Sequence, residues 1–139
     1  MRQFTNVFSI RTRGRGLYEF TDQVATWADA QQIETGLLTL FCRHTSASLL
    51  IQENAAPAVR DDLEAFFATI APEDEDRYSH DDEGPDDMPA HIRAALTHVS
   101  LSIPVAAGRL ALGTWQGVYL FEHRRAPHLR EVAGHLLGA

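Results

Sequence analysis

Apolar and polar residues alternate along several short stretches of the chain, which is the pattern of half-buried β-strands. Strands are predicted over residues 3–11, 37–44, 47–53, 99–105 and 110–123. Gly14 and Gly16 mark a turn after the first of these strands. The last stretch, residues 128–138, is ambiguous, because its propensities tolerate a helix while its leucine and valine spacing tolerates a strand.

Three other stretches repeat their apolar residues at the spacing of a helix. The first begins at Thr21 or Asp22, and its apolar face is Val24, Trp27 and Ala28. The second begins at Pro57 and has the most regular apolar stripe, formed by Val59, Leu63, Phe66, Phe67 and Ile70. The third begins near Asp87 and Pro89 and is predicted to bury Ile92, Ala95, Leu96 and Val99.

The length of the chain predicts one domain over residues 1–139, since no linker or internal repeat divides it. The N-terminus has no continuous apolar stretch and so does not resemble a signal peptide. No window approaches the ~20 apolar residues of a membrane span. We therefore expect a cytoplasmic protein without a membrane partner. The single cysteine, Cys42, excludes an internal disulfide and any multi-cysteine zinc motif.

The formal net charge of −7 comes from one segment of the chain. Residues 73–87 hold nine acidic residues and one arginine, and they show no apolar periodicity, which predicts a loop. The rest of the chain is nearly neutral, with eleven arginines against ten acidic residues. Because nucleic acid requires a basic face, this distribution argues against a nucleic-acid partner. Clustered carboxylates need solvent or a cation, and a cation is the sharper hypothesis.

Seven histidines are the main candidates for metal chemistry. His44 ends a predicted strand, His80 lies in the acidic segment, and His91 lies in the first turn of a helix. His91 follows Asp87 by four residues, so both side chains can project from one face of that helix. Imidazole with carboxylate is the ligand set expected for Zn²⁺ or a related divalent ion, although this spacing matches no local zinc motif. Surface or purely structural roles for these histidines stay open.

Other reactive groups lack the surroundings that catalysis needs. Cys42 lies in an apolar run where nothing activates a thiol, and Ser46 and Ser48 lack the Gly-x-Ser-x-Gly turn of a serine nucleophile. No glycine-rich phosphate loop exists, so a phosphate would have to meet arginine, backbone amides or a metal. The segment Gly113–Gly117 predicts either a bulge where the backbone approaches a ligand, or a core tryptophan at a strand bend.

A series of motifs follows in one order along nearly the whole chain. The first half comprises His44-Thr45-Ser46-Ala47-Ser48, Gln52-Glu53-Asn54 and Arg60-Asp61-Asp62. The second half comprises Tyr78-Ser79-His80-Asp81, the run Gly84–Ile92, the run Leu112–Gly117 and Glu122-His123-Arg124. Together, from about residue 5 to the end, these motifs resemble the signature of the YjbQ-like family, UPF0047.

The resemblance implies an α+β fold in which the strands form a compact sheet sandwich packed by helices, with residues 128–138 as a final strand. It also implies a homotrimer with sites near subunit boundaries. Members of the family are described as secondary thiamine-phosphate synthases, which join hydroxymethylpyrimidine diphosphate to thiazole phosphate and release pyrophosphate. The word "secondary" leaves room for a different native substrate.

If this reaction applies, a divalent cation, Zn²⁺ or Mg²⁺, and an arginine would stabilise the departing pyrophosphate. The candidate metal ligands are His44, His80 and His91. The candidate acid/base carboxylates are Glu53 and Glu122. The candidate contacts to a small phosphorylated substrate are Asn54, Gln116 and Arg124.

Two other functions fit the same residues. A metal-dependent hydrolase of a small phosphorylated or acylated metabolite would use the same histidines with a bound water. A non-catalytic trimer that binds a small ligand or a metal would need the pocket but no acid/base pair. The presence of both Glu53 and Glu122 favours an enzyme over the non-catalytic trimer.

Overall fold

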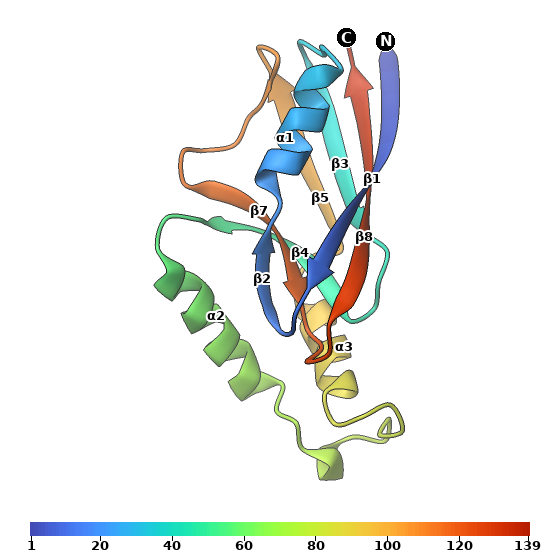
Figure 1. The fold of residues 1–139 in the computed structure, drawn as a ribbon, viewed down its shortest axis with the longest axis vertical. Helices are drawn as coiled ribbons and strands as arrows, with labels where there is room; N and C mark the ends of the chain where they lie inside the picture. The colour runs from blue at the N-terminus through green and yellow to red at the C-terminus, as the bar shows by residue number, and fades with distance from the viewer.

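Eight strands and three α-helices make up the chain in the computed structural model, which describes residues 1–139 (Figure 1). The strands are β1 (Arg2–Thr12), β2 (Gly16–Glu19), β3 (Gly36–Cys42), β4 (Ala47–Glu53), β5 (Ser100–Ala106), β6 (Arg109–Leu110), β7 (Gln116–Glu122) and β8 (His128–Gly138). The α-helices are α1 (Thr21–Ala30), α2 (Pro57–Ile70) and α3 (Asp87–Leu96), and a 3₁₀ turn covers Glu75–Arg77. The predicted α+β fold is confirmed. None of the helices has the length and apolar character needed to span a membrane.

Five strands form the larger sheet, in the order β1-β8-β3-β5-β6 with every neighbouring pair antiparallel. β8 lies between β1 and β3 and pairs with β1 along its whole length, from Gly138 opposite Arg2 to His128 opposite Thr12. Both edges of β8 are therefore hydrogen-bonded. This pairing makes residues 128–138 a strand, as the family resemblance implied, although their own propensities also tolerate a helix.

Three strands form the smaller sheet, in the order β2-β7-β4. The central strand β7 is buried from Gly117 to Glu122. The register places Glu122 opposite Ala47 at one end and Gln116 opposite Glu53 at the other. Six residue steps of about 3.3 Å put these two ends roughly 20 Å apart. This separation limits which residues of one chain can share a site.

The core fills the space between the sheets and α1, which in Figure 1 lies over the larger sheet and runs roughly along β3 and β5. Val24 and Ala28 of α1 are buried, and Trp27 packs edge-on against Phe8 of β1 with ring centroids 5.7 Å apart. The apolar face predicted for the first helix therefore does face the core. Phe20, at the start of the helix, packs against Phe8 as well.

The stretch 110–123, predicted as one strand, is divided between the two sheets. β6 ends at Leu110 beside β5, whereas β7 begins at Gln116 in the smaller sheet. Between them the chain turns, and the backbone N–H of Gly113 donates to Oε1 of Gln116 at 2.8 Å. Trp115 lies on this turn and is 63% exposed, so it is not a core residue. The sequence did not predict β2, because four residues are too few to show an alternation of apolar and polar positions.

Helix α2 exists where its apolar stripe predicts it, but the stripe is only partly covered. No side chain of α2 is buried, and Phe66 and Ile70 are 57% and 42% exposed. Figure 1 shows α2 diverging from the sheets beside β2. The apolar periodicity therefore predicts the helix correctly, but it does not predict how far the rest of the chain covers the apolar face.

Helix α3 buries a different face from the predicted one. Pro89, Ala90, Arg93 and Ala94 are buried, while Leu96 of the predicted stripe is 59% exposed. The small alanine side chains allow the helix to lie close to β4, so this face is turned inward. The prediction of a buried stripe along Ile92, Ala95, Leu96 and Val99 is wrong.

Candidate metal centre

Two imidazoles and two carboxylates converge at the beginning of α3. One ligand atom from each of His80, Glu83, Asp87 and His91 lies within 4.8 Å of the others. Oδ2 of Asp87 is at the middle of the group, 2.8 Å from Nε2 of His80 and 3.1 Å from Nε2 of His91. Asp87 and His91 come from the first turn of the helix at positions i and i+4, while His80 and Glu83 come from the acidic segment.

A bond outside the group orients His91. Its Nδ1 lies 2.9 Å from the carbonyl oxygen of Thr45, which can only accept, so Nδ1 carries the proton and Nε2 faces Asp87. Proteins commonly orient a metal-ligating histidine by such a bond to its second nitrogen. A neutral His91 then presents a lone pair to a carboxylate oxygen. A second proton or a cation between the two atoms removes this repulsion.

His80 lies in a strongly acidic environment. Its Nε2 is 3.4 Å from Oε2 of Glu83 and its Nδ1 is 3.6 Å from Oδ1 of Asp82, in addition to the bond with Asp87. The hydrogen bond with Asp87 and the neighbouring carboxylates raise the pKa of His80 above its ordinary value. His80 is therefore a histidine for which protons compete strongly with a metal ion.

Arg124 holds the carboxylates and binds the oxygen of Asp87 that the histidines do not contact. Its Nη1 donates to Oδ1 of Asp87 at 2.6 Å, its Nε to Oδ2 of Asp86 at 3.1 Å, and its Nη2 to the carbonyl oxygen of Glu83 at 3.0 Å. Burial works to raise the pKa of Asp87, but the hydrogen bonds with His80 and Glu83, followed by nearby positive charge that includes Arg124, outweigh it and lower that pKa. Asp87 is therefore ionised and rigidly held. The predicted phosphate contact of Arg124 stays a prediction, because its nitrogens already bind protein oxygens here.

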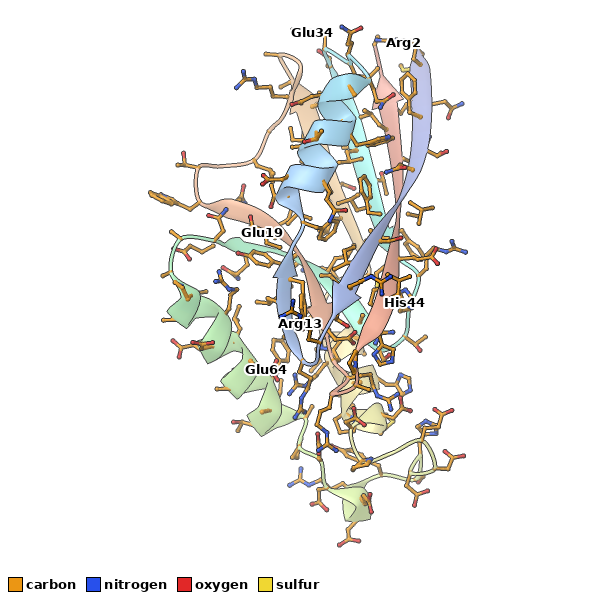
Figure 2. All side chains as sticks on the ribbon, in the orientation of Figure 1. Arg2, Arg13, Glu19, Glu34, His44 and Glu64 are labelled. Carbon is orange, nitrogen blue, oxygen red and sulfur yellow. The ribbon has the colours of Figure 1, made fainter.

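His44 lies outside the group of four within one chain. It is at the end of β3 near the start of β8 (Figure 2), where its Nε2 accepts the backbone N–H of Glu131 at 2.8 Å. Burial, followed by the charge of Arg130, lowers the pKa of His44. Arg43, His44 and Glu131 line a small pocket of about 170 Å³. The structure thus brings together two of the three predicted metal histidines, and a metal-binding role for His44 stays a prediction.

Glu122 is a fully engaged buried carboxylate. Its Oε1 accepts from Thr12 at 2.6 Å and from Nε of Arg130 at 2.8 Å, and its Oε2 accepts from Nη2 of Arg130 at 2.5 Å. Oε2 also accepts the backbone N–H groups of His123 and Arg124. Burial would raise the pKa of Glu122, but Arg130 and Thr12 outweigh it and lower the pKa. This geometry suits a residue that holds the chain around Arg124 better than an acid/base.

The remaining predicted residues lie at the other end of the smaller sheet. Oε2 of Glu53 accepts the backbone N–H of Ala56 at the start of α2, and Nδ2 of Asn54 donates to Glu19 at 3.2 Å. Figure 2 shows Glu19 on the β2 side of the molecule, away from His44. Gln116, paired with Glu53, is about 20 Å along the strands from Glu122. Within one chain these residues do not meet the metal group, and their roles in catalysis or binding stay predictions.

Two members of the group were not among the predicted ligands. Asp87 could be found from its four-residue spacing to His91, which places both side chains on one face of the helix. Glu83 carries no such signal, because it lies in a loop where nine acidic residues look alike in the sequence. Arg130, the partner of Glu122, was also missed, since only the pairing of β8 brings it there.

Comparison with known proteins identifies the family. The model of the UPF0047 protein YjbQ-like family matches residues 6–139. A UPF0047 protein of Synechocystis sp. is 54% identical over 99% of this chain and 93% of its own, and YjbQ of Escherichia coli O157:H7 is 41% identical over 97% and 98%. A crystal structure of a YjbQ/UPF0047 protein from Clostridium acetobutylicum, 32% identical, superimposes with a TM-score of 0.86 over 95% of this chain and 99% of that one. The chain therefore belongs to the UPF0047, YjbQ-like family.

Proposed function

We propose that this chain is a divalent metal-dependent enzyme whose cation is held by His80, Glu83, Asp87 and His91. The observation that carries the proposal is the convergence of their four ligand atoms within 4.8 Å. Two imidazoles with carboxylates suit Zn²⁺ or another first-row ion better than Mg²⁺, which prefers oxygen ligands and water. The bond from Nδ1 of His91 to Thr45, which directs Nε2 at Asp87, supports the same reading.

The residues around the centre would prepare it before a cation binds. Arg124 holds Oδ1 of Asp87 and leaves Oδ2 directed at both imidazoles. Thr45 keeps the proton of His91 on Nδ1, so that Nε2 is free to ligate. His80 and Glu83 come from the exposed segment and would close over the ion. A bound divalent cation supplies a Lewis acid for a phosphate oxygen and a water that ionises more readily.

The reaction proposed first is the one that the family resemblance implies, thiamine-phosphate synthesis. The carbon–oxygen bond between the pyrimidine methylene and the diphosphate breaks, and pyrophosphate leaves with its electron pair. The thiazole nitrogen then forms the new carbon–nitrogen bond to that methylene. Negative charge develops on the leaving oxygen, so the pyrophosphate belongs beside the metal-binding group.

A metal-dependent hydrolase of a small phosphorylated metabolite is the second candidate, and the bonding of Arg124 favours it. A synthase needs cationic groups to hold a departing pyrophosphate, but Arg124 is bound to Asp86, Asp87 and the carbonyl of Glu83. A hydrolase does not have to hold a departing pyrophosphate, so the cation and a water bound to it would serve without a free arginine.

Assembly as a homotrimer belongs to the same proposal. Apolar side chains on the outer face of the larger sheet are 39–51% exposed, namely Val7, Leu37, Phe41, Leu129 and Leu137. Two of them, Val7 and Phe41, line a groove of about 310 Å³. Apolar faces of this kind are commonly covered by another subunit. Assembly is also the route by which Glu53 and Asn54 of one copy can reach the cation of another.

Metal analysis and two turnover assays test the proposed function. Protein purified without a histidine tag is assayed for bound metal, for thiamine phosphate formation from the two precursors, and for phosphate release from small phosphorylated compounds. Wild type and His98→Ala, an exposed histidine outside the group, should hold metal and turn over one substrate set equally. Asp87→Asn should lose both properties. Turnover that survives complete metal removal would refute metal dependence, and bound metal without either turnover would refute an enzyme of these two classes.

A further inference from the structure

Four buried polar atoms, none of them from a proposed metal ligand, have no hydrogen-bond partner in the chain. They are Nε and Nη2 of Arg93, Oε2 of Glu64 and Nδ1 of His123. Arg93 is 0% exposed and His123 is 1% exposed. Because Arg93 belongs to α3, Glu64 to α2 and His123 follows β7, these atoms lie where two helices meet the smaller sheet.

Printed contacts connect the three side chains to the same two helices and to β7. Nη1 of Arg93 donates to Oε1 of Glu64 at 2.8 Å, so the guanidinium charge is already balanced. The ring of His123 packs on Phe121 at 4.4 Å, and Phe121 packs edge-on against Phe67 of α2 at 5.4 Å. Burial, followed by the charge of Arg93, lowers the pKa of His123 to about 3, so its imidazole is neutral near pH 7.

A chain of short contacts decides which nitrogen of His123 carries the proton. Oγ1 of Thr97 is 2.8 Å from the carbonyl oxygen of Arg93 and 2.6 Å from Oγ of Ser48, which is 2.8 Å from Nε2 of His123. The carbonyl can only accept, so Thr97 donates to it and must accept from Ser48. Ser48 must then accept from His123. Nε2 of His123 is therefore protonated, and its unpartnered Nδ1 is an acceptor.

The unpartnered atoms thus consist of donors and acceptors in a complementary set. Nε–H and one N–H of Nη2 lie parallel along one edge of a planar guanidinium, so in Arg93 both can reach a single acceptor. Oε2 of Glu64 and Nδ1 of His123 can only accept. A molecule that bonds all of these atoms must accept hydrogen bonds from Arg93 and donate hydrogen bonds to Glu64 and His123.

We propose that the enclosed atoms of Arg93, Glu64 and His123 bind one internal water molecule. The water accepts from the free edge of Arg93 and donates to Oε2 of Glu64 and to Nδ1 of His123, which uses all four of its hydrogen-bonding positions. An anion does not fit, because Glu64 already neutralises Arg93 and the lone pair of His123 would face it. A metal ion does not fit either, because it would face the guanidinium.

Energetics favour a filled site over a dry one. Each buried polar group without a partner carries its full desolvation penalty, and there are four such atoms on these three side chains. Immobilising one water costs less than leaving even two of these groups unpaired. The water would complete a network that joins α2 and α3 to β4 and β7 through Arg93, His123 and Ser48. None of the residues in this network is a proposed metal ligand. The network nevertheless holds α3, which carries the two proposed ligands Asp87 and His91.

A high-resolution crystal structure of the wild-type protein is the first test. It should show one isolated density peak within hydrogen-bond distance of the free edge of Arg93 and of Nδ1 of His123. Long-range proton–nitrogen NMR should place the ring proton of His123 on Nε2. Oxygen-17 relaxation dispersion should count one fewer long-lived water in His123→Phe than in wild type, and no change in the matched surface variant His98→Phe.

Three results would overturn the proposal. The first is a structure in which the free edge of Arg93 bonds a protein oxygen and no density lies beside it. The second is a proton on Nδ1 of His123, which would turn the acceptor into a donor. The third is density for an anion or a larger molecule at the site. Should His123→Phe fail to fold, the crystal structure and the NMR measurement on the wild-type protein still decide.

Discussion

Replacing His123 with glutamine is expected to remove a strong source of acid sensitivity from the folded chain. Burial, together with the positive charges of Arg93 and Arg130, lowers the pKa of His123 to about 3. In the unfolded chain the same imidazole titrates near ~6.5. Between these values the unfolded state binds a proton that the folded state does not, so folding loses stability as the pH falls from about 6.5 towards 3. Glutamine does not titrate, and its amide can still donate to Ser48.

The size of the effect follows from the two pKa values of His123. Each pH unit below the unfolded pKa costs the folded state about 1.4 kcal/mol per proton, so the free energy of unfolding should be about 2 kcal/mol lower at pH 5 than at pH 8. The figure holds as long as the folded pKa stays below about 4. Every other titrating group is the same in wild type and His123→Gln, so its contribution cancels in the comparison.

Urea unfolding at pH 5 and pH 8 measures this difference directly. Both proteins must be compared at one protein concentration, since assembly would add to the apparent stability. The free energy of unfolding of wild type should fall by about 2 kcal/mol more than that of His123→Gln. Equal decreases in the two proteins would refute the reasoning, because they would mean that His123 is not held neutral in the folded interior.

Three further outcomes are expected. Chelation of metal-loaded protein should speed hydrogen exchange across residues 78–92 while leaving β8 unchanged, and unaltered exchange across that segment would count against a cation there. Glu122→Gln should lower the free energy of unfolding by about 3–5 kcal/mol in urea, because it leaves the buried guanidinium of Arg130 without its charge partner; a loss below about 1 kcal/mol would show that the pair is not a buried ion pair. Sedimentation should show a homotrimer, and a monomer that persists at all concentrations would contradict that expectation.

Local patterns predicted most of the secondary structure, and pairing over long sequence distances accounts for what they missed. The apolar stripe from Val59 to Ile70 indicates α2 correctly, because helical periodicity is a property of adjacent turns. The strand over residues 128–138 depends instead on two neighbours more than 80 residues away in sequence, β1 and β3, for its hydrogen bonds. The division of residues 110–123 between two sheets also depends on pairing with distant strands. The apolar pattern of this stretch looks continuous in the sequence, but a turn at Gly113 interrupts it.

The candidate site was predictable only where its residues share an element or a marked segment. His80 stands out within the acidic segment and His91 within the first turn of a helix, and the fold brings both to Asp87. Glu53 and Glu122 look like a matched pair in the sequence, yet the antiparallel register of β4 and β7 places them at opposite ends of one sheet. The register of two strands is set by their pairing across the sheet, and the residues adjacent to Glu53 and Glu122 in the sequence do not reveal it.

Calorimetric titration of zinc into metal-free protein tests the proposed metal centre most directly. Wild type and His98→Ala should bind one Zn²⁺ per chain with equal affinity. Asp87→Asn and His91→Ala should each weaken binding by at least about 10-fold, since that loss is typical even for groups that only support a ligand. Binding should also weaken as the pH falls, because the raised pKa of His80 lets protons compete for its lone pair. Failure of wild type to bind zinc, or equal binding by wild type and Asp87→Asn, would contradict a metal centre at this group.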